Sequence, residues 1–597
     1  MTEFLIANMA PLMFAALVFF LLLGYPVAFA LAANGIVFGL LGIELGLLSP
    51  SLFGALPERL WGIMSNDTLL AIPFFTFMGL ILERSGMAED LLDTIGQLFG
   101  PVRGGLGYAV IFVGALLAAT TGVVAASVIS MGLISLPIML RYGYDRRYAA
   151  GTIAASGTLA QIIPPSLVLI IMADQLGRSV GDMYAGAFIP GIVLAGLYAG
   201  YTLLVSLVKP QWVPALPLEA RTIREPDGSP GTRSLAVLTV VSVAAAVAFW
   251  QLYFNALHPE TATDERLVIC ATIGVGVAFF ASVINNVLKL GLLSRIAERV
   301  TFVLIPPLAL IFLVLGTIFL GVATPTEGGA MGAGGALVMA VARRRLTWKL
   351  MSQGMETTAK LTAFVVFILI GARVFSLTFY GVDGHKWVEH LLTGLPGGQL
   401  GFLIVVNILV FLLAFFLDFF ELSFIVVPLL GPVAEKLGID LIWFGVLLGV
   451  NMQTSFMHPP FGFALFYLRS VAPAKEYVDK LTKKTMAPIT TGQIYWGAVP
   501  YVVIQVIMIG LVILFPQMVM VYKSDASKVD PSKVEILIPE IESGEPAAGG
   551  GGAPGAPAGE KAPESKDPLE RMIDKQEEDA DEANKANKAL EDALKTK

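Results

Sequence analysis

The sequence predicts an all-α membrane protein built from two related halves. Hydrophobic residues make up 56% of the 597 residues and charged residues only 14%, whereas soluble domains carry about 25% charged residues. Apolar runs recur along the chain, many of them near the roughly 20 residues that a helix needs to cross a bilayer core. A polar motif that ends in Pro-Pro occurs twice, at residues 156–165 and 451–460. This duplication favours an internal repeat that spans most of the membrane body.

The charge distribution excludes several classes of protein. The net charge of −7 lies in the tail, because the segment from Lys523 onward holds 18 acidic and 11 basic residues and the remainder is neutral. A nucleic-acid-binding protein would need a basic face. The single cysteine, Cys270, and four histidines without helical ligand spacing argue against a disulfide framework and against a zinc or haem enzyme. We therefore expect no enzyme.

The apolar runs define the predicted organisation. They cover Phe4–Leu23, Pro26–Ile43, Leu69–Leu82, Tyr108–Leu140, Tyr148–Ile171, Tyr184–Val208, Leu235–Phe254, Leu267–Leu288, Thr301–Leu320, Pro325–Ala342, Leu361–Phe379, Leu400–Leu430, Leu441–Leu468 and Tyr495–Val521. We predict a first membrane repeat at 1–208, an inserted segment with two extra transmembrane helices at 209–299, a second, inverted repeat at 300–522 and a polar low-complexity tail at 523–597. The insert's role is open, with extra scaffold contact as our interpretation.

Two apolar runs are too long for one simple helix, and their flanking charges predict re-entrant hairpins. Arginines bracket the run 108–140 on both sides, at positions 103, 141, 146 and 147, and basic residues gather in cytoplasmic loops. The run therefore enters and leaves on the cytoplasmic side, with a small and polar tip at 120–127. The run 400–430 is flanked mainly by acidic residues, so the second hairpin should open outward. Such tips are tolerated where they are buried in protein or line a cavity.

The duplicated motif follows each hairpin and supplies the predicted chemistry. Further pairs extend the match: residues 184–190 resemble 495–500, and the Gly-Tyr-Pro junction at 24–26 matches 321–325. An odd number of crossings in each half predicts that the second half is inverted, which places substrate and ion sites at the bilayer midplane. Proline has no N–H and clashes with the carbonyl four residues earlier, so each Pro-Pro leaves free carbonyls. Such oxygens suit a hard cation such as sodium, although a lone Pro-Pro would more often be only a kink.

The chain resembles a known family, the large membrane (M, DctM-like) subunit of tripartite ATP-independent periplasmic (TRAP) transporters. The resemblance covers about residues 5–515 and rests on Ile72-Pro73-Phe74-Phe75 through Gly79, Glu83-Arg84-Ser85-Gly86, residues 157–166, Thr324-Pro325-Thr326-Glu327 and residues 428–440. It implies a sodium-coupled elevator transporter, in which a mobile part carrying both hairpins and both Pro-broken helices slides against a scaffold. It also implies a small membrane (Q) subunit and a periplasmic solute-binding (P) subunit that delivers the solute.

The resemblance further implies two sodium sites. The first would use the tip around Gly122 and Ser127, with Ala160, Ile163 and Pro165. The second would use the tip near Asp418, with Ser455, His458 and Phe461. This sequence departs from the family pattern at Val123, Val124, Ser455 and His458. Backbone ligands survive such changes, whereas hydroxyl ligands do not.

Ionisable groups in membrane segments cost about 2.5–3.5 kcal/mol each and are functional candidates. Arg373 has the planar fork that binds a carboxylate bidentately; the alternative is an internal salt bridge with Asp418 or Glu421, which in turn are candidates for helix capping. We expect Glu327 to cap the helix that it opens, and His458 to be a satisfied polar side chain. Helix N-termini after the breaks would attract an anion. The polar side chains placed to orient it are Thr158, Asn451 and Gln453.

We therefore predict a subunit of the bacterial inner membrane that imports an organic acid (a carboxylate) with Na⁺ as the coupling ion. Two alternatives remain open from the sequence. One is a stand-alone sodium/anion symporter of related architecture, and the other is an integral membrane enzyme, although no nucleophile, base and orienting group recur at useful spacing. The sequence does not identify the solute or the sodium stoichiometry.

Overall fold

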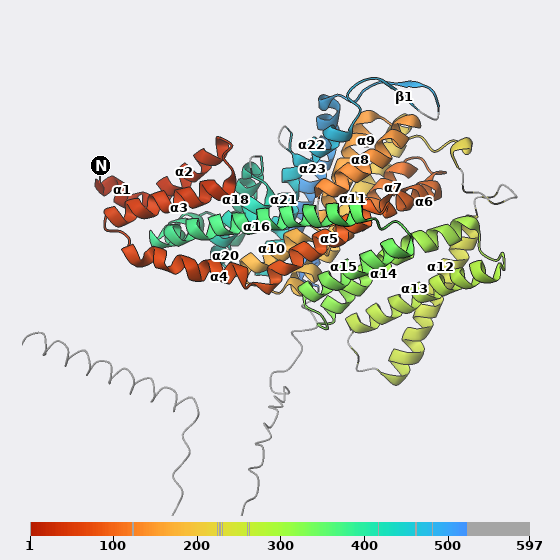
Figure 1. Ribbon diagram of the computed structural model, residues 1–597, viewed down its shortest axis with the longest axis horizontal. Helices are drawn as coiled ribbons and strands as arrows, with labels where there is room; N and C mark the ends of the chain where they lie inside the picture. Colours follow the sequence, from red (N-terminus) through yellow and green to blue (C-terminus); the bar gives the residue numbers. More distant parts are fainter. Residues whose placement is uncertain are drawn as a thin grey trace, which may run out of the picture. The chain divides into compact units, whose positions relative to one another are not determined.

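The protein is helical throughout the part of the chain that the structure describes, apart from one pair of very short strands. This computed structural model describes residues 2–521 except 122–123, 222, 224, 226–228, 230, 259–260, 262, 416, 460–461 and 480–481. The predicted tail at 523–597 lies outside the described residues. The strands β1 (Tyr477–Val478) and β2 (Thr485–Met486) pair antiparallel in the loop that precedes the last long helix (Figure 1).

The helices form two similar series with a two-helix segment between them. The first series contains α1 (Thr2–Ala7), α2 (Met9–Leu22), α3 (Val27–Glu44), α4 (Leu56–Met64), α5 (Ala71–Arg84), α6 (Met87–Phe99), α7 (Gly105–Thr121), α8 (Val124–Arg141), α9 (Arg146–Thr158), α10 (Leu167–Leu176) and α11 (Val180–Val208). The middle segment contains α12 (Thr232–Phe249), a π-helical turn (Trp250–Asn255) and α13 (Thr263–Leu288). The second series contains α14 (Arg295–Phe319), α15 (Pro325–Ala342), α16 (Trp348–Gly381), α17 (Gly384–Thr393), α18 (Gly398–Leu413), α19 (Phe419–Ile425), α20 (Val427–Lys436), α21 (Leu441–Met452), α22 (Phe463–Val471), α23 (Thr491–Leu514) and α24 (Gln517–Met520).

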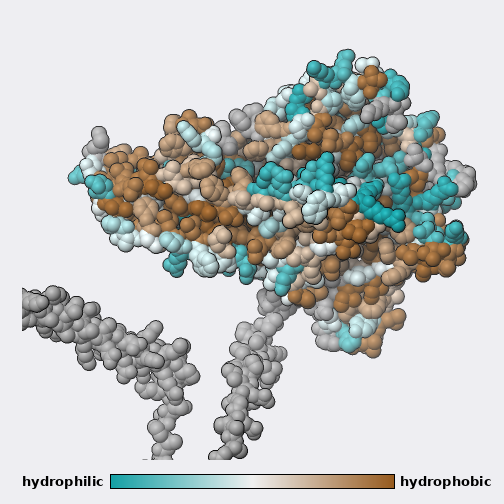
Figure 2. All heavy atoms as spheres, viewed as in Figure 1, coloured by the Kyte–Doolittle hydropathy of each residue, from teal (hydrophilic) through white to brown (hydrophobic). Residues whose placement is uncertain are grey.

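Length and composition confirm a multi-pass membrane protein. Eight of the described helices are long and apolar enough to cross a membrane, or up to ten if each of two bent helix pairs forms one span. Apolar side chains cover much of the visible face of these helices (Figure 2). Short 3₁₀ turns join several of them: η1 (Pro50–Ala55), η2 (Asp67–Leu70), η3 (Leu159–Gln161), η4 (Pro210–Trp212), η5 (Leu218–Ala220) and η7 (Gln453–Phe456).

Both predicted helix breaks are present, and they have the same construction. Helix α9 ends in η3 and α10 resumes after Pro164, while α21 ends in η7 and α22 resumes after Pro459. Each broken helix begins at an aspartate N-cap: Asp145 accepts from the amides of residues 147 and 148, and Asp440 from those of residues 442 and 443. The caps are separated by the same 295 positions as the two prolines. The repeat therefore extends over the whole of each broken helix.

The long helices outside the breaks also pack as mirror pairs. Helix α3 packs along α16 and α5 packs along α15, so each contact pairs one helix from each series. Glycines allow these close crossings: a Cβ on Gly371 would lie 2.4 Å from the carbonyl oxygen of Ala28, and one on Gly332 would lie 2.5 Å from the sulfur of Met78. The paired junctions before α3 and α15 both contain a glycine with positive φ, +80° at Gly24 and +68° at Gly321, which side chains rarely adopt.

A second pair of related contacts joins the broken helices to the last long helix of each series. Helix α9 packs on α23, where a Cβ on Gly497 would lie 2.1 Å from the carbonyl oxygen of Arg147. Helix α21 packs on α11, where a Cβ on Gly186 would lie 3.1 Å from the side chain of Ile442. Gly186 and Gly497 stand at the same position of the Tyr-X-Gly-Ala motif, and Arg147 and Ile442 are 295 residues apart. The two contacts are thus copies of each other.

An ion pair ties the strand loop to the base of the first hairpin. The Nε and Nη2 atoms of Arg141, at the end of α8, donate to the Oδ1 atom of Asp479 at 3.0 and 2.9 Å. The amide and hydroxyl of Thr482 donate to Oδ2. Only 3% of the Asp479 side chain is exposed, and 16% of that of Arg141. The guanidinium holds the pKa of Asp479 well below its usual range.

We expect Asp479→Ala to destabilise the folded protein by about 3 kcal/mol at pH 7, because it leaves the Arg141 guanidinium buried without its partner. Since the pKa of Asp479 is lowered by folding, the contribution is complete at neutral pH and is lost only as the pH falls through that lowered pKa. Thermal melts of the purified protein measure the effect. Glu356→Ala is the matched control, because the Glu356–Lys360 pair is exposed and such pairs contribute little. Equal melts for the two variants would contradict the prediction.

Candidate functional site

The first hairpin consists of α7 and α8, which pack on each other and on the broken helix α9. Of the predicted tip residues, Gly122 lies outside the described residues. Ser127 is buried on α8 with 1% of its surface exposed. Val124 and Ala125, within the predicted tip at 120–127, line a cavity between the hairpins. The hairpin therefore brings its tip toward the helix break, as the sequence predicts.

The second hairpin turns between α18 and α19, and its carboxylates cap the returning helix. The amide of Glu421 donates to Oδ1 of Asp418 at 3.0 Å, and the amide of Asp418 donates to Oε2 of Glu421 at 3.0 Å. This reciprocal capping box begins α19. Thr324 and Glu327 form the same arrangement at the start of α15, which confirms the structural role expected for Glu327.

The two helix breaks meet where the repeats face each other. The Nε2 atom of Gln453 donates to the hydroxyl of Thr158 at 3.2 Å, and these residues are again 295 positions apart. Equivalent positions of the two copies are therefore in direct contact. The Nδ2 atom of Asn451 donates to the carbonyl and side-chain oxygens of Asn407 on α18, at 2.8 and 2.9 Å. All three predicted solute-orienting side chains are fully buried and hold the elements together; their binding role stays a prediction.

The backbone at each break follows the same pattern. The amides of Ile162 and Ile163 both donate to the carbonyl of Leu159, and those of Met457 and His458 both donate to the carbonyl of Thr454. The next carbonyls belong to Ala160 and Ser455, whose helical donors four residues later would be Pro164 and Pro459. Proline has no N–H to give. Both carbonyls thus lack the helical partner, in agreement with the predicted free oxygens.

The other predicted ion ligands have mixed placements. The hydroxyl of Ser455 donates to the carbonyl of Met452 at 2.6 Å, while the carbonyl of His458 accepts from the amide of Gly462 at 2.6 Å. The His458 ring lies between Phe411 and Phe415, with centroid distances of 4.1 and 4.4 Å. Neither ring nitrogen has a partner among the described residues, so His458 is not the satisfied polar side chain that we expected. The peptide bond between Pro164 and Pro165 is cis, and Phe461 lies outside the described residues.

A cavity of about 350 Å³ lies between the two hairpin tips and the two breaks. Its walls come from both series of helices and from α16. It is lined by Val124, Ala125, Gln161, Leu167, Leu361, Phe364, Asp418, Phe419, Phe420, Glu421, Phe456, Phe463 and Tyr467. Gln161, in η3, is 1% exposed, and neither atom of its side-chain amide has a partner among the described residues. Gln161 is therefore a buried amide in the cavity wall whose hydrogen-bonding capacity is unused.

Sequence reasoning missed Gln161, although it stands inside the duplicated motif. The signal was available: an amide occurs three residues before Pro-Pro in the first copy, where the second copy has Phe456. The structure places these equivalent residues in the same cavity lining. Arg373, by contrast, is exposed on α16 and does not line the cavity. No ion pair joins it to Asp418 or Glu421 in the part of the chain that the structure describes, so the alternative of an internal salt bridge is not seen there.

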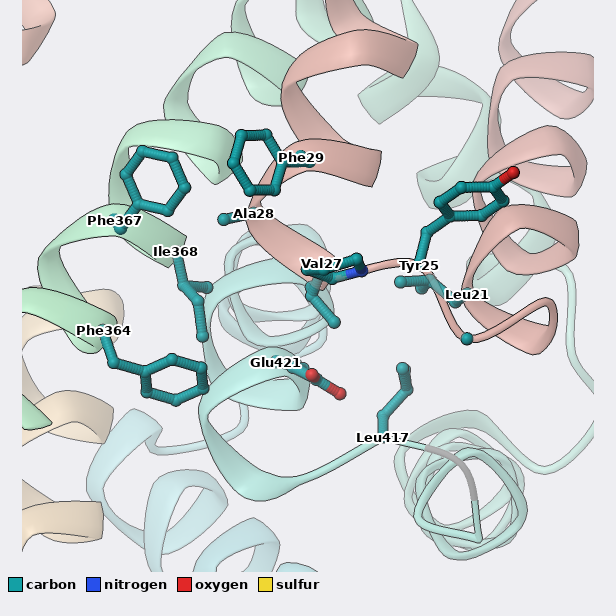
Figure 3. Close-up of a pocket in the computed structure, with 12 residues that line it drawn as sticks. Leu21, Tyr25, Val27, Ala28, Phe29, Phe364, Phe367, Ile368, Leu417 and Glu421 are labelled. Atoms are coloured by element: carbon teal, nitrogen blue, oxygen red, sulfur yellow. The ribbon is translucent and has the colours of Figure 1, made fainter.

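A second cavity of about 290 Å³ borders the first. Its lining includes the Gly24–Pro26 junction, Phe364 and Phe367 of α16, and Glu421 (Figure 3). Figure 3 shows the Glu421 carboxylate pointing between Leu417 and Val27. Phe364 and Glu421 belong to the linings of both cavities. The second hairpin tip therefore contributes one carboxylate, that of Glu421, to both cavities.

Comparison with known proteins agrees with this architecture. The family model for the DctM component of tripartite ATP-independent periplasmic transporters matches residues 14–518. The C4-dicarboxylate TRAP transporter large permease protein DctM of Pseudomonas aeruginosa is 28% identical over 71% of this chain and 82% of its own length. The sialic acid TRAP transporter permease protein SiaT of Haemophilus influenzae is 22% identical over 78% of this chain and 61% of its own length.

A search of solved structures matches the YdaH transporter of Alcanivorax borkumensis, with a TM-score of 0.43 and 14% identity over 78% of this chain and 88% of that chain. The relatives are permeases rather than enzymes, which is consistent with the absence of a catalytic constellation in the sequence. The duplicated breaks, the hairpins and the family match over residues 14–518 lead to one conclusion. The chain belongs to the DctM family, the large permease components of tripartite ATP-independent periplasmic transporters.

Proposed function

We propose that this permease imports an organic acid together with sodium ions. The proposal rests on two backbone carbonyls, those of Ala160 and Ser455, which lack the N–H donor that a regular helix would provide. They stand at equivalent positions beside the two hairpin tips. Sodium prefers oxygen ligands of this kind, and these residues therefore fit the ion. Each sodium charge that moves inward gains about 2.3 kcal/mol per 100 mV of membrane potential. Two or three ions supply enough energy to move an anion uphill.

The proposal includes partners and movement. The solute reaches the permease from a periplasmic binding protein, and a small membrane subunit completes the complex, as the family name implies. The hairpins and broken helices pack on one another, which supports their movement as one body against α3, α5, α15 and α16. A stand-alone sodium/anion symporter is the second candidate, since the inverted repeat alone is compatible with it. Uptake by vesicles that contain the permease without its binding protein would favour that candidate.

We expect sodium chloride to raise the melting temperature of the purified permease more than potassium chloride does, because sodium binds the folded state. Pro164→Ala should reduce this difference, since the new amide can pair with the carbonyl of Ala160. Pro137→Ala is the matched control: Pro137 lies inside α8, away from both breaks. In vesicles that contain the whole complex, an inward sodium gradient should drive uptake. Equal melting shifts for the two salts, or uptake that is independent of sodium, would overturn the proposal.

A further inference from the structure

Aromatic rings form a continuous wall along the cavity between the hairpin tips. Phe364 of α16 meets Phe420 edge to face, with ring centroids 6.0 Å apart and an interplanar angle of 86°. Phe420 lies against Phe419, and Phe419 is 6.2 Å from Phe456. Phe456 in turn is 6.0 Å from Phe463. The wall therefore runs from the long helix of the second series through the hairpin to the second break.

The cavity has few polar groups, and the charged ones are carboxylates, whereas a dianion needs cationic partners. No lysine, arginine or histidine occurs among the described residues that line it. The two carboxylates, Asp418 and Glu421, are both acceptors in their ionised form. A dicarboxylate would have to bury two negative charges beside phenyl rings and near two carboxylates, without a side-chain cation. Buried charges without partners are costly, so the lining disfavours such a solute.

The part of the lining formed by Gln161 and the start of α10, which a hydrogen bond from Ser166 to the carbonyl of Gln161 holds together, can hold a single anionic group. Gln161 presents an unpartnered amide there, and Leu167, which also lines the cavity, begins α10. The N-cap of α10, Ser166, makes no side-chain hydrogen bond to the first turn, so the first amides are free to meet an anion. A volume of about 350 Å³ exceeds the roughly 150 Å³ in which an engineered apolar cavity binds benzene.

Building on the proposed transport function, we propose that the solute is an aromatic monocarboxylate and that the permease discriminates against dicarboxylates. Its carboxylate meets Gln161 and the start of α10, and its ring packs on the aromatic wall. Aromatic pairs prefer edge-to-face or offset geometry with centroids 4.5–7 Å apart, which is the spacing already present between the wall residues. The carboxylates of Asp418 and Glu421 face a coupling cation rather than the solute.

Two probes test the inference: phenylacetate as an aromatic monocarboxylate and succinate as a dicarboxylate. In sodium chloride, phenylacetate should stabilise the purified permease in a concentration-dependent manner, whereas succinate should not. Phe456→Leu and Phe463→Leu should each weaken phenylacetate binding by about threefold to tenfold, the range expected for loss of one aromatic contact. Phe466→Leu is the matched control, because Phe466 also lies on α22 but is 48% exposed and does not line the cavity.

The outcomes separate this inference from the transport function. Stabilisation by succinate but not by phenylacetate overturns the substrate class, while a sodium-dependent melting shift in the same preparation leaves the proposed function intact. Absence of stabilisation by phenylacetate in sodium chloride also overturns the inference. Equal effects of Phe456→Leu and Phe466→Leu would show that the wall does not contact the solute. Loss of all sodium dependence would instead overturn the proposed function.

Discussion

Replacing Gly151 with valine is expected to prevent the two series of helices from assembling. A Cβ at this position would lie 2.0 Å from the carbonyl oxygen of Gly497 and 2.6 Å from its carbon. Backbone atoms cannot rotate away as a side chain can, so α9 and α23 would have to separate. We expect destabilisation of at least about 3 kcal/mol, the upper part of the range for overpacked cores. Size-exclusion chromatography and thermal melts of the detergent-purified protein measure the loss of folded monodisperse material.

The repeat provides graded controls for this prediction. Gly186→Val should be milder than Gly497→Val, because its nearest neighbours are the side chains of Val519 and Ile442 at 3.0 and 3.1 Å rather than a carbonyl. Gly196→Val, on α11 with no atom within 4 Å of a new Cβ, should leave folding nearly unchanged. The expected order of damage is therefore Gly497, Gly186, Gly196. A variant at Gly151 that folds as well as the one at Gly196 would show that this crossing is looser than described.

Gln161→Leu is expected to lower uptake by about tenfold to a hundredfold while raising stability. The amide has no partner among the described residues, and removal of a buried unpaired polar group relieves a cost of about 1–3 kcal/mol. A hydrogen bond to a charged ligand contributes about 1.5–3 kcal/mol, which sets the expected loss of transport. Melting curves and sodium-driven uptake of phenylacetate and succinate, in the full complex, measure the two effects separately.

The expected decrease in uptake and the expected increase in stability distinguish a binding role of Gln161 from a structural one. Gln453→Leu is the matched control, since this glutamine donates to Thr158 and its loss should lower stability. If Gln161→Leu also lowered stability and left uptake at the wild-type rate, Gln161 would belong to the scaffold. Both residues are glutamines close to a Pro-Pro motif, so their local sequence does not distinguish them. Their hydrogen bonds do, because Gln453 donates to Thr158 and Gln161 has no partner among the described residues.

Much of the fold follows from features that act locally in the sequence. Proline interrupts a helix wherever it stands inside one, so the breaks at Pro164 and Pro459 and their pairing are predictable. Apolar length predicts α11 as Tyr184–Val208, and the structure has Val180–Val208. The N-terminal run 4–23 is divided into α1 and α2. The run 69–82 lies in one arm of a bent helix pair, Pro50–Met64 and Asp67–Arg84, whose arms meet at an angle of 47°. The bend was not predicted, because a hydropathy pattern records composition but not the direction of a helix.

The site was less predictable, because the direction of a side chain depends on contacts between distant segments. Thr158 and Gln453 are polar residues at the breaks, and their type alone suggested solute binding. It did not reveal that the inverted arrangement brings the two side chains into contact with each other. Arg373 occupies an apolar stretch that looks buried, yet it is exposed on α16. The aromatic wall joins residues from α16, α19, η7 and α22. No spacing rule within one segment reveals such a surface.

Gln161 and Phe456 occupy equivalent positions in the two copies of the repeat, yet one is an amide and the other an aromatic ring. The hairpin tips differ as well, since Asp418 and Glu421 have no acidic counterpart at the first tip. The two copies therefore build chemically unlike walls around one cavity. An asymmetric molecule is expected to bind there in a single orientation, although the backbone around it is duplicated.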